Sequence, residues 1–239
     1  MAALQQSDYR IRKLIGILGV AMPFALPLSA GDLLSSISHH YYLALPSLIF
    51  IIILSTLGLF LISYKGYQKD GTGPKELLSD DWITNIGGIA ALVVVMVPTS
   101  CLASDNVIID AICQTNIELM KKGEPTNFPL LGHNDVFKNG VHLISAGVFM
   151  LAMGWMSAFK FTRGTDRTGK EHRFYRICGY LVWAAVGVLL LYFVLGKIFP
   201  NFPEFTYIVY IMETVAIVPF GASWLVKGQT MTFIKSLMH

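Results

Sequence analysis

The run Leu48-Ile49-Phe50-Ile51-Ile52-Ile53-Leu54 lies inside an apolar segment that extends from Leu43 to Tyr64. A helix that crosses the hydrocarbon core of a bilayer needs about 20 mainly apolar residues. Apolar segments of this length without the period-two alternation of a strand indicate helices, because lipid offers no partner for open backbone groups. This segment is therefore predicted to be a membrane-spanning helix.

Five further segments share this character, so the sequence predicts an all-α, polytopic transmembrane bundle of six helices. The predicted spans are Leu14–Ala30, Leu43–Tyr64, Trp82–Ala103, Val141–Phe161, Phe174–Phe199 and Phe205–Val226. A cytoplasmic N-terminus places fourteen Lys and Arg residues in the inner segments and four in the outer ones. Because positive residues concentrate in cytoplasmic loops, both termini are predicted to be cytoplasmic.

The overall composition agrees with this fold class. The 239-residue chain is 54% hydrophobic and only 14% charged, with a mean hydropathy of +0.58 and a formal net charge of +3. Soluble domains average about 25% charged residues. A soluble enzyme, a disordered chain and a nucleic-acid binder are therefore excluded as classes. No internal repeat or linker divides the chain, and residues 1–239 are expected to form a single domain.

The segment between the third and fourth spans, at about 104–140, is long enough to have structure of its own. Asp105 or Asn106 is suited to cap a helix, and Gly123 with Pro125 would end it. Cys101 lies at the outer end of the third span and Cys113 lies in this loop. In an oxidising compartment these two cysteines could form a disulfide; the alternative is that they are two independent small apolar residues.

Polar residues suited to chemistry gather toward the predicted outer side. Glu213 lies about eight residues into the sixth span, roughly 12 Å deep, where a carboxylate needs a partner or a water-filled cavity. We therefore expect an outer-leaflet pocket that contains Glu213 and the other polar residues of this side. The predicted pocket residues are Asp32, Ser36, Ser38, His39, His40, His142, Ser145 and Glu213.

Three functions remain open for such a pocket. The first is binding or handling of a lipid or small amphipathic ligand, with membrane lipids as partners and no nucleic acid. The second is a metal-dependent intramembrane lipid hydrolase, in which zinc is held by His39, His40, His142 and Glu213. No HxxxH or HExxH spacing supports the metal, and no catalytic residue is assigned. The third is a structural or partner-binding membrane subunit.

Each pocket residue also has a purely structural interpretation. His39 and His40 could be interfacial residues at the start of the second span, beside Tyr41 and Tyr42. His142 could bond a neighbouring carbonyl, and Ser145 could be a small residue at a helix contact. Glu213 could form an interhelical hydrogen bond as a protonated acid.

The order of short motifs along the chain resembles the six-span membrane proteins of the Frag/DRAM/Sfk family, and more closely their bacterial relatives. The motifs are Ile37-Ser38-His39, Tyr64-Lys65-Gly66-Tyr67, Asn85-Ile86-Gly87-Gly88, Val97-Pro98-Thr99, His142-Leu143-Ile144-Ser145-Ala146-Gly147, Tyr175-Arg176-Ile177-Cys178-Gly179 and Phe220-Gly221-Ala222-Ser223-Trp224-Leu225-Val226-Lys227-Gly228. His39 stands where the eukaryotic pattern tends to have an acidic residue. The resemblance implies six helices and a bacterial cytoplasmic membrane. Through eukaryotic members it also implies roles in lysosomal or autophagic membranes and in remodelling of lipid anchors.

Overall fold

The structure is a computed structural model that describes residues 2–66, 79–102, 104, 106–163 and 168–228. All regular secondary structure in these ranges is helical. The elements are α1 (Ala2–Ala30), the 3₁₀ helix η1 (Ile37–Tyr42), α2 (Ala44–Ser63), α3 (Asp80–Met96), α4 (Val107–Lys122), α5 (Val136–Trp155), the π-helical turn η2 (Met156–Lys160), α6 (Lys170–Ile198) and α7 (Ile208–Lys227). The expected all-α fold class is confirmed for these residues.

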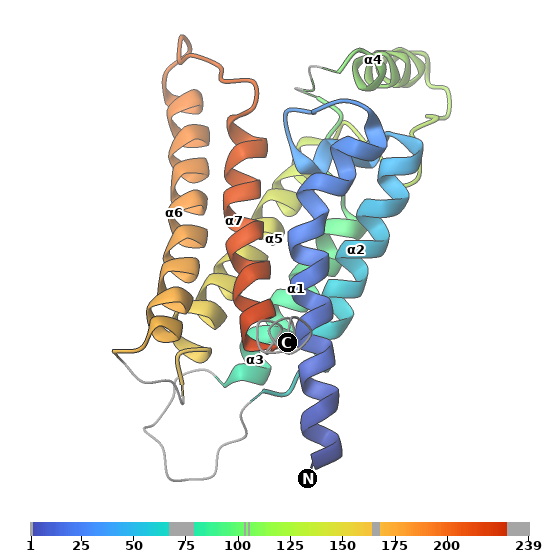
Figure 1. The fold of residues 1–239 in the computed structure, drawn as a ribbon. Coiled ribbons are helices and arrows are strands. Elements are labelled where there is room, and N and C mark those ends of the chain that lie inside the picture. Colours follow the sequence, from blue (N-terminus) through green and yellow to red (C-terminus); the bar gives the residue numbers. More distant parts are fainter. Residues whose placement is uncertain (1, 67–78, 103, 105, 164–167, 229–239) are drawn as a thin grey trace.

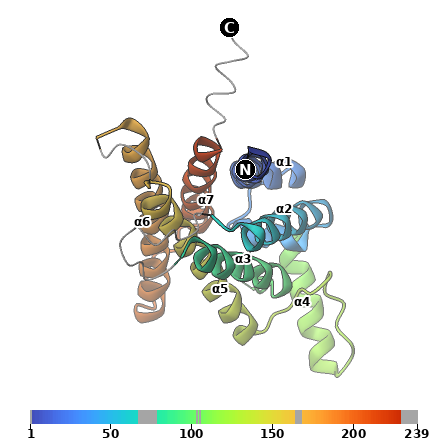
Figure 2. The same cartoon turned by 90° about the horizontal axis from the view of Figure 1, so that it is seen from below.

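Six of the helices form a closed ring. Each helix contacts the next in the order α1, α2, α3, α5, α6 and α7, and α7 returns to α1 (Figure 2). Successive helices run in opposite directions, so that α1 begins and α7 ends at the same end of the bundle (Figure 1). The helix α4 lies outside the ring, across the opposite end, which we call the α4 end. The end that carries η2 is called the η2 end.

Five described helical segments are long and apolar enough to cross a membrane. They are Tyr9–Ala30, Ala44–Ser63, Val136–Lys160, Lys170–Ile198 and Ile208–Lys227. Large apolar side chains also lie on the surface of the bundle: Leu28 is 82% exposed, Ile52 62% and Leu190 65%. An exterior of this kind is expected to face lipid, because a soluble protein rarely exposes extended apolar surface. The fold therefore defines an integral membrane protein.

The third predicted span differs from the observed helix at its end. The expected segment continued to Ala103, whereas α3 ends at Met96 after 17 residues. Pro98 has no N–H to donate to the carbonyl of Val94, and a proline also disfavours helical geometry in the residue before it. Val97 accordingly leaves the helix, with φ −125° and ψ 83°. The chain that follows runs across the α4 end.

Glycines allow three pairs of helices in the ring to approach closely. A Cβ atom built on Gly221 of α7 would lie 2.9 Å from the carbonyl oxygen of Gly16 in α1. On α3, a Cβ at Gly88 would lie 2.6 Å from the carbonyl oxygen of Gly58 in α2, and one at Gly179 of α6 would lie 2.6 Å from that of Gly154 in α5. Small residues at helix contacts are typical of membrane bundles, because they let the backbones meet.

The expected helix in the 104–140 segment is α4, and its ends have the anticipated caps. The Asn106 Oδ1 atom accepts hydrogen bonds from the N–H groups of Ile108 and Ile109. Gly123 ends the helix in the left-handed region, with φ 73°. Cys101 and Cys113 are joined by a disulfide, with their Cα atoms 5.6 Å apart. The disulfide attaches α4 to the segment that follows α3.

Candidate functional site

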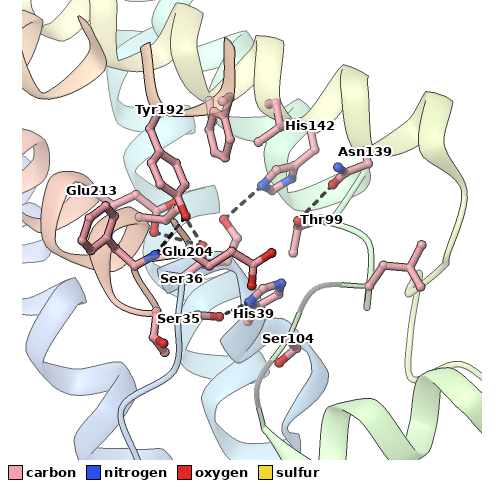
Figure 3. Close-up of a pocket in the computed structure, with 18 residues that line it drawn as sticks. Ser35, Ser36, His39, Thr99, Ser104, Asn139, His142, Tyr192, Glu204 and Glu213 are labelled. Carbon is pink, nitrogen blue, oxygen red and sulfur yellow. Dashed lines mark hydrogen bonds between the residues drawn. The ribbon is translucent and has the colours of Figure 1, made fainter. Parts of the chain in front are cut away.

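A cavity of about 450 Å³ lies at the α4 end, between η1, α5, α6 and α7 (Figure 3). Its polar lining comes from Ser35, Ser36, Ser38, His39, Thr99, Ser104, Asn139, His142, Tyr192, Glu204, Thr206 and Glu213. Its apolar lining comes from Leu102, Leu143, Ala146, Phe193, Phe205 and Val209. Such mixed lining is typical of small-molecule sites, where apolar surface gives area and a few polar groups give orientation.

Glu213 contributes a carboxylate to this cavity and also holds η1 in place. Its Oε2 atom accepts hydrogen bonds from the Ile37 N–H at 2.7 Å and from the Ser36 hydroxyl at 3.0 Å. Ile37 is the first residue of η1, where backbone N–H groups have no partner within the helix. Glu213 therefore acts as an acceptor at the start of η1, and its hydrogen bonds join α7 to this segment (Figure 3).

Ser36 has a second hydrogen bond that fixes the same turn. As the N-cap of η1, its hydroxyl oxygen accepts the N–H of Ser38 at 3.1 Å. The backbone adds one more connection, because the Tyr210 N–H donates to the Ser35 carbonyl at 3.0 Å. The turn that carries the side chains of Ser38 and His39 is thus fixed to α7 by hydrogen bonds of the Glu213 side chain and of the Tyr210 backbone.

His142 connects α5 with η1 and with the end of α3. Its Nδ1 atom lies 2.8 Å from the Val97 carbonyl oxygen, and its Nε2 atom lies 3.0 Å from the Ser38 hydroxyl. A carbonyl can only accept, so Nδ1 carries the hydrogen and Nε2 of the neutral ring accepts from Ser38. The Val97 carbonyl is accessible because the helix has ended there, before Pro98. His142 is 2% exposed, so this ring is fixed within the cavity lining.

His39 lines the cavity near Ser35. The Nδ1 atom of His39 is 3.0 Å from the Ser35 hydroxyl oxygen, and the two side chains are labelled in Figure 3. This pair is local, because both residues belong to the segment between α1 and α2. Five predicted pocket residues therefore lie in one cavity: Ser36, Ser38, His39, His142 and Glu213.

Three predicted pocket residues do not line the cavity. Asp32 accepts hydrogen bonds from the Leu33 N–H and from the Asn106 side chain. His40 is fully buried, and its Nδ1 atom contacts the carbonyl oxygens of Ser36 and Ile37. Ser145 was expected on the face of His142, but the lining residue one turn after His142 is Ala146.

Sequence reasoning missed several polar lining residues. Asn139 lies three residues before His142, so helical periodicity would have placed it on the same face of α5. Its Oδ1 atom accepts the Thr99 hydroxyl at 3.0 Å and the Ser100 N–H at 2.9 Å. Tyr192 and Glu204 come from the α6 end and the α6–α7 loop. No pattern in their own segments marks these two, because only the bundle geometry brings them to the cavity.

The expected zinc ligands do not meet in the described part of the chain. Among these residues, no three His, Cys, Asp or Glu side chains are grouped in a way that could hold a metal ion. His40, one of the four candidate ligands, points its Nδ1 atom at two backbone carbonyls instead. The geometry therefore gives no support to the metal-dependent interpretation.

A second set of hydrogen bonds at the α4 end centres on Tyr42. Its hydroxyl donates toward the carbonyl oxygens of Thr99 at 2.7 Å and His133 at 2.9 Å, and accepts the His133 N–H at 3.1 Å. Burial raises the pKa of Tyr42 to about 12. Burial also lowers the pKa of His133, whose Nε2 atom lies 2.8 Å from the Pro98 carbonyl oxygen. These hydrogen bonds join η1 to the segments that follow α3 and precede α5.

The cavity lies where α5 and α6 separate. At the η2 end the two helices are in close contact, because a Cβ at Gly179 would meet Ala158 and Gly154. Toward the α4 end, Gly147 of α5 and Gly187 of α6 have no atom within 4 Å of a built Cβ. Figure 1 shows the two helices close at one end and apart at the other.

The separation leaves part of the cavity lining on the exterior of the bundle. Leu143 of α5 and Phe193 of α6 both line the cavity, and they are 42% and 41% exposed. The polar groups of the cavity and the apolar exterior are thus connected between these two helices.

Comparison with known proteins found no matching family model, curated protein or solved structure.

Proposed function

We propose that this chain is a six-span integral membrane protein whose cavity binds a lipid or small amphipathic ligand from the outer leaflet. The ligand's polar group lies among Ser36, Ser38, His142 and Glu213. Its apolar part extends out of the cavity between α5 and α6. The observation that carries this proposal is the continuity of buried polar groups with exposed apolar lining at Leu143 and Phe193.

The sixth span of the proposal is α3. Its 17 residues have a length of about 26 Å, close to the roughly 30 Å of a hydrocarbon core. In the ring it lies between α2 and α5, both of which are long and apolar enough to span. A helix in that position crosses the membrane with its neighbours.

The α4 end is proposed to face away from the cytoplasm. The distribution of Lys and Arg along the chain, fourteen against four, supports this orientation. The disulfide between Cys101 and Cys113 also lies at the α4 end, and disulfides persist in oxidising compartments. The resemblance to bacterial relatives of the Frag/DRAM/Sfk family suggests the bacterial cytoplasmic membrane.

Lipid binding can be tested with a phosphatidylcholine that carries a photoreactive diazirine in one acyl chain. The purified full-length protein is reconstituted in phosphatidylcholine vesicles with this lipid, irradiated, and the crosslinked peptides are mapped. We expect crosslinks near Leu143 and Phe193. The substitution Ala146→Trp fills the cavity from α5 and should reduce these crosslinks at least about tenfold, equivalent to about 1.4 kcal/mol.

The matched control places the same residue type, tryptophan, on the outside of the same helix. Ile144 is 70% exposed and does not line the cavity, so Ile144→Trp should leave the cavity crosslinks unchanged. Equal crosslinking in Ala146→Trp and in the unmodified protein would mean that lipid touches only the exterior. That result contradicts the binding function and favours a structural or partner-binding role.

A further inference from the structure

Ser38 and His142 have the arrangement of a nucleophile with its general base. The Ser38 hydroxyl and the His142 Nε2 atom are 3.0 Å apart, and both residues line the cavity. The His142 Nδ1 atom is held at 2.8 Å by the Val97 carbonyl, so Nε2 has a free lone pair for the Ser38 proton. A hydroxyl, an imidazole that accepts its proton and a third group that orients the imidazole are the parts of a nucleophilic serine site.

Each part of this arrangement comes from a different element. Ser38 is carried by η1, which Ser36 and Glu213 fix in place. His142 is in α5, and the orienting carbonyl follows α3. The residues Ser38 and His142 are 104 positions apart in sequence, so only the bundle geometry brings them together. Their side chains are 7% and 2% exposed, which keeps both rotamers fixed.

We infer that Ser38 is an acyl-accepting nucleophile that attacks the carboxylic ester of a membrane lipid. This inference rests on the proposed function, because the lipid must first place its acyl chain between α5 and α6. The ester carbonyl then lies at the polar end of the cavity, next to Ser38.

The reaction has two balanced steps. In the first, the Ser38 proton moves to Nε2 of His142 while the Ser38 Oγ atom bonds to the acyl carbon. The bond from this carbon to the lipid alkoxide oxygen breaks, and the leaving alcohol takes the proton from His142. In the second step the oxygen of a hydroxyl acceptor, either water or the alcohol of a second lipid, bonds to the acyl carbon, and the bond from this carbon to the Ser38 Oγ atom breaks. His142 takes the acceptor proton and returns a proton to Ser38.

Covalent labelling tests the nucleophile directly. A long-chain alkyl fluorophosphonate is incubated with the full-length protein in vesicles, and the modified peptide is identified by mass spectrometry. The Ser38 Oγ atom forms a bond to phosphorus, fluoride leaves, and His142 takes the proton. We expect phosphonylation at Ser38 and at least about a tenfold slower reaction in His142→Gln.

The control and the site mapping keep the test independent of folding. Ser145 lies on α5 outside the cavity lining, so Ser145→Ala should be labelled at the same rate as the unmodified protein. The modified residue is mapped in the unmodified protein, so the result does not depend on whether Ser38→Ala folds. No labelling at Ser38, with the Cys101–Cys113 disulfide intact, overturns the inference.

The two proposals fail in different ways. If the diazirine lipid crosslinks at Leu143 and Phe193 but the fluorophosphonate does not react, the cavity binds lipid without catalysis. If Ser38 reacts but no lipid crosslinks there, the proposed lipid binding is wrong, and with it the assignment of a lipid ester. Free fatty acid released from labelled phosphatidylcholine identifies water as the acceptor, whereas acylation of added lysophospholipid identifies an alcohol.

Discussion

Backbone carbonyls near prolines determine where several polar side chains of the α4 end point. His142 bonds the Val97 carbonyl and His133 bonds the Pro98 carbonyl, just after α3 has ended. The same logic applies in α1, where Pro27 cannot donate to the Pro23 carbonyl, and the Tyr210 hydroxyl donates to it instead. These side chains satisfy carbonyls that the helices leave open, as buried polar groups require.

The hydrogen bonds of His133 predict that stability falls in mild acid. Its Nε2 atom bonds the Pro98 carbonyl, while its Nδ1 atom accepts the Asp135 N–H at 3.1 Å and cannot also hold a proton. Burial lowers the folded pKa of His133; the hydrogen bond to the Pro98 carbonyl opposes this, Lys138 lowers the pKa further, and Asp135 raises it. Because the unfolded pKa is about 6.5, the contribution to stability is complete above that pH. It is lost as the pH falls from there through the folded pKa.

This pH dependence can be measured by thermal unfolding at about pH 8 and about pH 5. Other groups also titrate in this range, so the comparison is with His133→Gln, which can still donate to Pro98 but has no titration. We expect a smaller decrease in Tm between the two pH values in His133→Gln than in the unmodified protein. Equal decreases in the two proteins would show that His133 does not contribute.

The candidate site could be predicted in part from residue types, and the misses follow from helical phase. A buried acid with serines and imidazoles on one side of the membrane indicated a polar cavity, and five of those residues line it. His39 and His40 are adjacent in a helix of about three residues per turn. Their side chains therefore point about a third of a turn apart, and only His39 reaches the cavity.

A similar phase argument applies on α5. Ser145 is three residues after His142 and Ala146 is four. At about 3.6 residues per turn, Asn139, Leu143 and Ala146 lie on one side of His142 around the helix, and Ser145 lies on the other side. The cavity is on the first side, so its lining contains Ala146 and not Ser145. Ser38 and His142 were both predicted to line the pocket, but their direct hydrogen bond had no sequence signal, because only the ring brings the two side chains together.

At the scale of the helices, the existence of each long element was predictable and the contacts between them were not. The second span, expected at Leu43–Tyr64, is observed as α2 at Ala44–Ser63. The third was expected to pass through Pro98, although a missing N–H ends it first. The neighbours in the ring follow chain order, but six similarly apolar helices offer no pattern that would specify which of their faces meet. In three of the pairs, glycines lie where the helices approach most closely.

These glycines yield a prediction about the α5–α6 contact. A methyl group in Gly179→Ala would lie 2.6 Å from both the Gly154 carbonyl oxygen and the Ala158 Cβ atom, so the helices must separate. Overpacking of this kind costs about 1–3 kcal/mol. We expect a lower apparent Tm for Gly179→Ala, measured in detergent at a fixed scan rate.

The control for this substitution lies on α5 itself. Gly147 has no atom within 4 Å of a built Cβ, so Gly147→Ala meets open space. Alanine favours a helix over glycine by up to about 1 kcal/mol, so the Tm should be unchanged or slightly higher. If both variants have the same Tm, close packing at Gly179 is not what holds α5 against α6.

For the whole molecule, the number of spans and the orientation are linked. With α3 as a span, α4 lies outside the cytoplasm and the α5–α6 connection lies inside. If α3 stays on the cytoplasmic side, α4 also stays there and every later segment is inverted. Lys122 at the end of α4 and Lys170 at the start of α6 are both exposed, so they report on the two alternatives.

Labelling of single cysteines in intact cells distinguishes these arrangements. Lys122→Cys and Lys170→Cys are each combined with Cys178→Ala, which removes the free cysteine of the described chain, while Cys101 and Cys113 stay paired. With six spans, a membrane-impermeant maleimide labels position 122 in intact cells and position 170 only after permeabilisation. Five spans with a cytoplasmic N-terminus give the reverse pattern. In that arrangement η1 stays outside while the start of α5 lies in the cytoplasm, so the reverse result would separate Ser38 from His142 across the membrane and contradict the cavity itself.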